Sequence, residues 1–129
     1  DPRGERATDR SIPLGYGDPR YDLVKLLHSS VYLYDTAVQG FFSLKPDHAV
    51  GSINSWRVQL FPPRNYQLVA KIFKQFSRRR KLTAEEERYL TASLFFSMLP
   101  LHSDSVRRQQ LLTLIGCCLV TDSFSQLLP

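Results

Sequence analysis

The stretch from Tyr66 to Leu99 constrains the fold most, because it encodes two consecutive helices and the signal that separates them. In its first part, apolar residues recur at steps of three and four, as the buried stripe of an amphipathic helix requires. These are Tyr66, Val69, Ile72, Phe73 and Phe76. The segment Thr83-Ala84-Glu85-Glu86 has the composition of a capping box, in which a hydroxyl and a carboxylate satisfy the first free amides of a helix. We therefore expect a helix over 66–81 and a new helix from Ala84.

An earlier helix is predicted from Asp18-Pro19, where an aspartate can cap free amides and a proline suits the first turn. Apolar residues then follow at helical spacing: Leu23, Leu27, Val31, Tyr34, Val38 and Phe41. Gly40 loosens the end of this helix and Lys45-Pro46 closes it. We expect Phe41, Phe42 and Leu44 to belong to the core.

The segment 47–61 fits two kinds of structure. A helix would place Ala49, Ile53, Trp56 and Leu60 on one face. A strand would instead alternate Trp56, Val58 and Leu60 with polar residues. Because a lone strand in an otherwise helical chain would have no partner for its backbone hydrogen bonds, we favour a second helix that ends before Pro62-Pro63.

The helix from Ala84 and one later helix complete the pattern. The helix over 84–99 begins with three glutamates, which suit the positive end of its dipole, and its apolar second half predicts burial nearly all round. Pro100 ends it. Ser103-Asp104-Ser105 offers caps for a last helix, which Asp122-Ser123 ends or bends before one further apolar turn.

Helices with short connections predict an all-α fold, which we assign to an up-down four-helix bundle. A chain of 129 residues suits one domain, which we assign to residues 18–129. Residues 1–17 mix charges, proline and glycine without a period, so we expect an extended N-terminal arm. The apolar arm residues either stay disordered or become ordered along a partner. They are Ile12, Leu14 and Tyr16.

Two further features limit the class of protein. The longest apolar run, Leu111 to Val120, is shorter than a bilayer-spanning helix, so we expect no membrane span, although association with a membrane surface stays open. Cys117 and Cys118 are adjacent, and neighbouring side chains on a helix point in different directions. We therefore expect buried thiols rather than a disulfide between them.

The net charge of +5 is concentrated, because no Asp or Glu occurs between Asp47 and Glu85. This window contains Arg57, Arg64, Lys71, Lys74, Arg78, Arg79, Arg80 and Lys81. A field of one sign favours an acidic partner, which is a protein, a nucleic acid or an anionic lipid. The same residues are also compatible with a solvated face and cations at a helix C-terminus.

Enzymatic and metal chemistry find little support in the sequence. His28, His48 and His102 are far apart, and none has a His or Cys at metal-ligand spacing. We find no nucleophile elbow, phosphate-binding glycine loop or zinc-protease motif. The three glutamates from Glu85 are explained by the helix start. We therefore predict a protein that is not an enzyme and has no cofactor.

Two functional hypotheses remain. In the first, a rigid helical protein docks onto a larger acidic complex through the basic residues of the window and the apolar residues of the arm. In the second, the basic residues follow phosphates and bind nucleic acid without sequence preference. The second hypothesis lacks a base-stacking motif, because Phe73 and Phe76 are assigned to the core.

The middle of the chain resembles a known family. The resemblance is carried by three segments: Tyr34-Asp35-Thr36-Ala37-Val38, the segment Val69 to Phe76 followed by Ser77-Arg78-Arg79-Arg80, and Leu82-Thr83, which opens the next helix. They look like the small four-helix-bundle lumenal proteins of photosystem II, which are extrinsic subunits and assembly factors. The resemblance implies a location in the thylakoid lumen and a role in supporting oxygen evolution. The adjacent cysteines and the long basic window match no pattern of that family.

Overall fold

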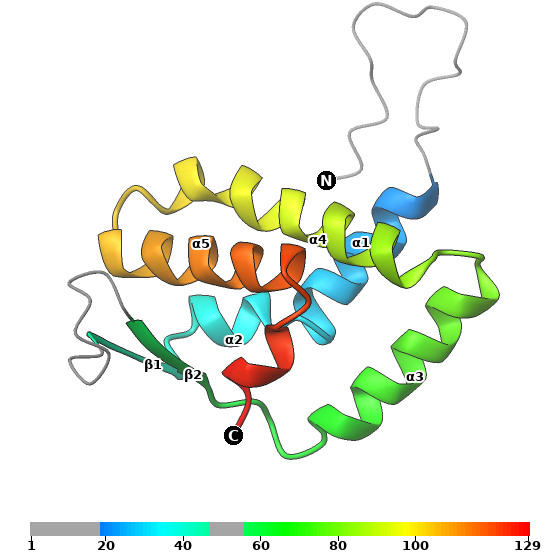
Figure 1. The fold of residues 1–129 in the computed structure, drawn as a ribbon, viewed down its shortest axis with the longest axis horizontal. Coiled ribbons are helices and arrows are strands. Elements are labelled where there is room, and N and C mark those ends of the chain that lie inside the picture. Colours follow the sequence, from blue (N-terminus) through cyan, green and yellow to red (C-terminus); the bar gives the residue numbers. More distant parts are fainter. Residues whose placement is uncertain (1–18, 47–55) are drawn as a thin grey trace, which may run out of the picture.

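The computed structural model describes residues 19–46 and 56–129, and the described chain is mostly helical with one small antiparallel sheet. The α-helices are α1 (Pro19–Ser30), α2 (Tyr34–Val38), α3 (Tyr66–Arg79), α4 (Ala84–Met98) and α5 (Val106–Val120). The strands are β1 (Phe42–Pro46) and β2 (Trp56–Leu60), and the 3₁₀ turns are η2 (Leu99–His102) and η3 (Phe124–Leu127). In Figure 1, α4 and α5 lie side by side. The hairpin formed by β1 and β2 lies at one end of this helix pair, and α3 lies at the other end. The predicted arm lies outside the described residues.

The helical signals of the second half of the chain are confirmed. The Thr83 hydroxyl accepts from the Glu86 amide at 3.1 Å, and the Glu86 carboxylate accepts from the Thr83 amide at 3.0 Å. The Thr83 hydroxyl also donates to the Glu86 carboxylate at 2.9 Å, and the Thr83 amide and hydroxyl together lower the pKa of the Glu86 carboxyl. Ser105 caps α5 in the same way, by accepting from the Arg108 amide. The last apolar turn is η3.

The single helix predicted to start at Asp18-Pro19 and to be closed by Lys45-Pro46 is wrong. The chain turns after Ser30, and Leu33 adopts a left-handed conformation with φ 61° that no α-helix can contain. Leu23 and Leu27 are buried as expected, but Phe41 is exposed beyond the end of α2 and is not a core residue. Residues 29–33 join serines to β-branched and aromatic residues, which have low helix propensity.

The helix favoured for 47–61 is also wrong where the structure describes it, because Trp56–Leu60 is a strand. Its partner is the segment 42–46, paired antiparallel with Phe42 opposite Leu60 and Leu44 opposite Val58. These four side chains share the inner face, where Leu44 and Leu60 are buried. The objection to a lone strand therefore does not apply. The described chain does not confirm an up-down four-helix bundle.

The core lies where α1, α4 and α5 meet. Its fully buried side chains include Leu27, Phe95, Leu111, Leu112, Ile115 and Leu119. Gly116 lets α4 and α5 approach closely, because a Cβ there would lie 2.7 Å from the Phe96 ring. The second half of α4 is not buried all round, since Phe96 is exposed, and Cys117 is exposed although a buried thiol is predicted. Among the described residues, no helix is both long and apolar enough to cross a bilayer.

Candidate docking surface

Helix α3 is attached to the rest of the protein by a hydrogen bond near each of its ends. At the first end, the Tyr66 hydroxyl donates to the Val31 carbonyl at 2.9 Å, and burial raises the pKa of this phenol. At the other end, the Ser77 hydroxyl donates to Glu87 Oε2 at 2.7 Å. Ser77 is the one buried residue of α3. The helix therefore rests on the surface of the protein rather than within its core.

Glu87 is a buried carboxylate that joins three parts of the chain. Besides Ser77, it accepts a hydrogen bond from the Tyr32 hydroxyl at 2.6 Å. Burial raises the pKa of Tyr32, and the hydrogen bond to Glu87 raises it further. Two hydroxyl donors satisfy the two carboxylate oxygens, as a buried acid requires. The sequence offered no signal for this role, since Glu85, Glu86 and Glu87 stand together at one helix start.

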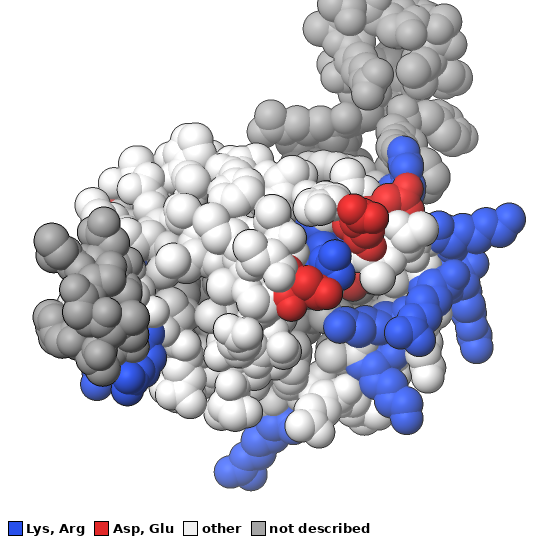
Figure 2. Space-filling model, in the orientation of Figure 1, with Lys and Arg blue, Asp and Glu red and all other residues white. Residues whose placement is uncertain are grey.

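One side of α3 carries a basic ridge, which we define as Lys71, Lys74 and Arg78. These residues follow one another at steps of three and four, so they share a face, and all three are exposed. The Lys74 amine lies 5.9 Å from the centre of the Tyr32 ring, a cation–π distance. Figure 2 shows Lys and Arg side chains gathered around α3, next to the acidic start of α4.

The basic residues Arg79, Arg80 and Lys81 form the end of α3. The Lys81 amide donates to the Arg78 carbonyl and the Leu82 amide donates to the Ser77 carbonyl, which is the Schellman pattern. Lys81 has φ 59° at the position where glycine is usual, so its backbone ends the helix. Their charges also lie at the negative end of the helix dipole. Part of the basic window is thus explained by helix termination.

The other predicted docking residues are dispersed. Arg57 lies on β2 opposite Lys45, and Figure 2 shows a separate group of basic side chains at the hairpin end. Arg64 lies in the connection before α3. The apolar arm residues Ile12, Leu14 and Tyr16 lie outside the described residues. The structure therefore gathers the basic ridge with Arg79, Arg80 and Lys81, and separates Arg57 from them.

Sequence reasoning missed an exposed apolar stripe on α3, which we define as Leu68, Ile72 and Phe76. Their exposed fractions are 62%, 53% and 41%. The prediction that Ile72 and Phe76 are buried is wrong, because only the side of α3 that carries Tyr66, Ala70 and Phe73 packs against the core. Arg80 lies over the Phe76 ring at 5.3 Å. Apolar and basic groups are therefore offered together by one helix.

A groove with a volume of about 550 Å³ lies beside the first turns of α3. Leu33, Tyr66 and Val69 give it apolar walls, which Phe41, Phe61, Pro62 and Pro63 continue. Its polar lining comprises Ser29, Ser30, Asp35, Thr36, Gln39 and Arg64. Val69 precedes Ile72 by three residues and Phe76 by seven, so the groove and the apolar stripe share one side of α3.

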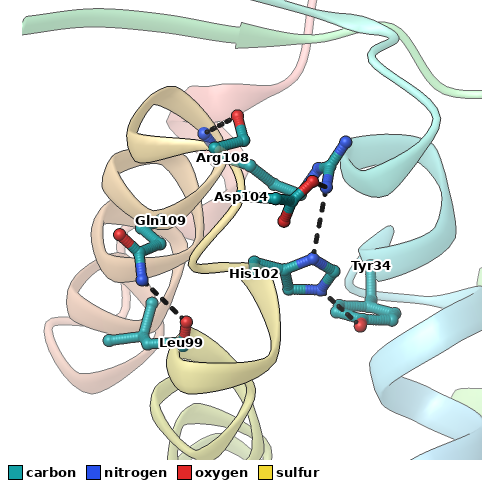
Figure 3. A network of polar contacts seen from close by, with 7 residues as sticks. Tyr34, Leu99, His102, Asp104, Arg108 and Gln109 are labelled. Atoms are coloured by element: carbon teal, nitrogen blue, oxygen red, sulfur yellow. Dashed lines mark hydrogen bonds and ion pairs between the residues drawn. The ribbon is translucent and has the colours of Figure 1, made fainter.

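A second polar network surrounds buried His102 (Figure 3). The Tyr34 hydroxyl lies 2.8 Å from Nε2, and the Arg108 guanidinium lies 3.4 Å from Nδ1 and 3.2 Å from Asp104. Because a guanidinium only donates, Nδ1 is the acceptor of the contact with Arg108. Gln109 also donates to the Leu99 carbonyl. These contacts connect α2 to the turn before α5.

His28 packs under this network with its ring centre 4.3 Å from those of Tyr34 and Phe95. Its Nε2 is buried without a hydrogen-bond partner among the described residues. Burial, together with a smaller contribution from the neighbouring charge of Lys25, lowers the pKa of His28 to about 4. The ring is therefore held neutral inside an aromatic cluster, which is an arrangement for packing.

Within residues 19–46 and 56–129, no three His, Cys, Asp or Glu side chains are grouped so that they could hold a metal ion. Comparisons with protein-family models, with curated proteins and with solved structures found no match for this chain. The surface chemistry of α3 is therefore the basis for assigning a function.

Proposed function

We propose that this protein is a non-enzymatic docking subunit that binds the acidic surface of a larger protein complex through α3. The observation that carries the proposal is the pairing, on one surface helix, of the basic ridge with the exposed apolar stripe. A partner must offer both acidic and apolar groups to match it, and protein surfaces do so. A phosphate backbone would use only the cations, which disfavours nucleic acid as the main ligand.

Capture of partners from a lysate of the source organism, at low salt and with and without nuclease, tests the proposal. The informative variant replaces Lys71, Arg78 and Arg79 by Gln, which removes charge and keeps helix propensity. Lys74 stays, because its amine lies over the Tyr32 ring. The charge-matched control replaces Lys45, Arg57 and Arg107 by Gln, which removes the same charge away from α3 and also removes the contact of Arg107 with the Phe42 ring. We expect acidic proteins that elute with salt and bind the α3 variant about tenfold more weakly, since each exposed ion pair contributes about 0.2 to 1 kcal/mol.

If the α3 variant and the control variant lost partner binding equally, the loss would follow from net charge alone, and the proposal would be contradicted. Capture that nuclease abolishes would favour the nucleic-acid hypothesis instead. The resemblance to photosystem II lumenal proteins stays a prediction, which the identification of photosystem subunits among the captured proteins would support. The docking role of Ile12, Leu14 and Tyr16 also stays a prediction, to be tested by replacing these three residues with Ser in the full chain.

A further inference from the structure

Resting on this proposed function, we infer that the element bound by α3 is an acidic amphipathic helix of the partner, which lies in the groove and along the apolar stripe. The shape of the surface is the first support. The stripe is not an isolated patch, because Val69 lines the groove and shares its side of α3 with Ile72 and Phe76. The apolar surface is therefore elongated and concave at one end, as helix-binding grooves are.

The second wall of this surface comes from α1. Ser30 lines the groove, and Leu26, one turn earlier on the same face of α1, is 42% exposed. The first turns of α3 stand opposite, and Leu33 contributes an apolar side chain to the lining between the two helices. An apolar side chain that enters here meets Leu33, the Tyr66 and Val69 side chains of α3, and Phe61 with the two prolines that follow it. The exposed stripe then continues along α3, whose 14 residues span roughly 21 Å.

Charge decides what kind of helix fits. Arg64 lines the groove at the first end of α3, and Arg79 and Arg80 stand at the other end, with Arg80 over the Phe76 ring. Asp35 is the one acid among the described lining residues. A bound helix of about four turns thus places its apolar face on the stripe and its flanks against cations. Asp and Glu at those flanks are attracted, whereas Lys and Arg are repelled.

Other occupants fit less well. A bilayer surface is broad, whereas the apolar surface leads into a groove that Phe61, Pro62 and Pro63 help to enclose. A second copy of the chain would bring its own basic α3 against this one. Single-stranded nucleic acid would stack on a row of aromatic faces, and although Phe41 and Phe61 line the groove, the stripe adds only Phe76 beside the aliphatic Leu68 and Ile72.

Selection from a display library of random peptides of about sixteen residues, at physiological ionic strength, tests the inference without a known partner. We expect enriched peptides with apolar residues at steps of three and four and an excess of Asp and Glu. Ile72→Ser with Phe76→Ser should weaken their binding about tenfold or more, because both anchors lose apolar contact. The control, Leu101→Ser with Val106→Ser, changes side chains that are 71% and 67% exposed on another part of the surface and should leave binding unchanged.

Failure to enrich any peptide, enrichment of basic peptides, or equal binding to the Ile72/Phe76 variant would overturn the inference. Three other results would also overturn the inference if the Ile72/Phe76 variant abolished them. These are binding to phosphatidylserine vesicles, binding to a single-stranded oligonucleotide, and self-association of the protein in sedimentation. Capture of the natural complex separates this inference from the proposed function. If the α3 Gln variant loses capture and the Ile72/Phe76 variant keeps it, docking stands and the helix inference fails; if the Gln variant keeps capture, the proposed function fails.

Discussion

Helix α3 and the pair α4–α5 have similar lengths, 14 residues against 15 and 15, and use their apolar residues in opposite ways. The pair buries Phe95, Leu111, Leu112 and Ile115 completely. In α3 the one buried residue is the polar Ser77, and three large apolar side chains face solvent. A sharply amphipathic sequence therefore does not imply a buried helix. Where packing uses only part of an apolar face, the remainder is available for a partner.

The largest expected effect tests the packed side of this comparison. Phe95→Ala should lower the free energy of unfolding by about 3 to 5 kcal/mol, because a fully buried ring in contact with the aromatic cluster is replaced by a cavity. Phe95→Leu, which keeps most of the volume, should cost less than half as much. Urea denaturation measures both. A loss under 1 kcal/mol for Phe95→Ala would show that the α4–α5 interface is not the main source of stability.

A smaller effect concerns the edge of the same core. The pKa of His28 is 6.5 in an unfolded chain and about 4 in the folded protein, so the unfolded state takes up a proton first as pH falls. Stability is therefore complete above about pH 6.5 and decreases toward pH 4, by about 2 kcal/mol at pH 5. His28→Phe keeps a ring in the cluster and should remove this pH dependence. Urea denaturation of the wild-type protein and of His28→Phe, at pH 7 and at pH 5, measures the loss of stability between the two pH values. An equal loss in the two proteins would contradict a buried neutral His28.

The sequence predicted the parts of the fold that local chemistry determines. The capping box at Thr83 and the cap at Ser105 depend on neighbours three residues away, and both are confirmed, together with the starts of α4 and α5. Helix α3 also begins where its apolar period predicts, although Asn65 makes no side-chain cap there. The strand Trp56–Leu60 could not be assigned in this way, because its partner Phe42–Pro46 precedes it across a segment of other residues. The break at Leu33 has no glycine or proline to mark it.

The candidate site was predictable only in its charges. The cations of α3 are readable from the sequence, since no acid interrupts them. Whether Ile72 and Phe76 face the core or solvent is not readable, because both fit the same helical period as the half-buried Val69 and Phe73. The direction from which the rest of the protein approaches α3 decides it. That direction is set by the distant contacts of Tyr66 with Val31 and of Ser77 with Glu87.

The smallest expected change in stability is the sharpest test of the open side of α3. Ile72→Ser with Phe76→Ser should lower the free energy of unfolding by only about 1 kcal/mol, because 53% and 41% of these side chains are already exposed. The same exchange at buried apolar positions, such as Leu112 and Ile115, would unfold most domains of this size. Thermal and urea denaturation measure the change beside the Leu101/Val106 control. If the free energy of unfolding of the Ile72/Phe76 variant falls by more than 2 kcal/mol, these residues belong to the core and α3 has no open apolar face.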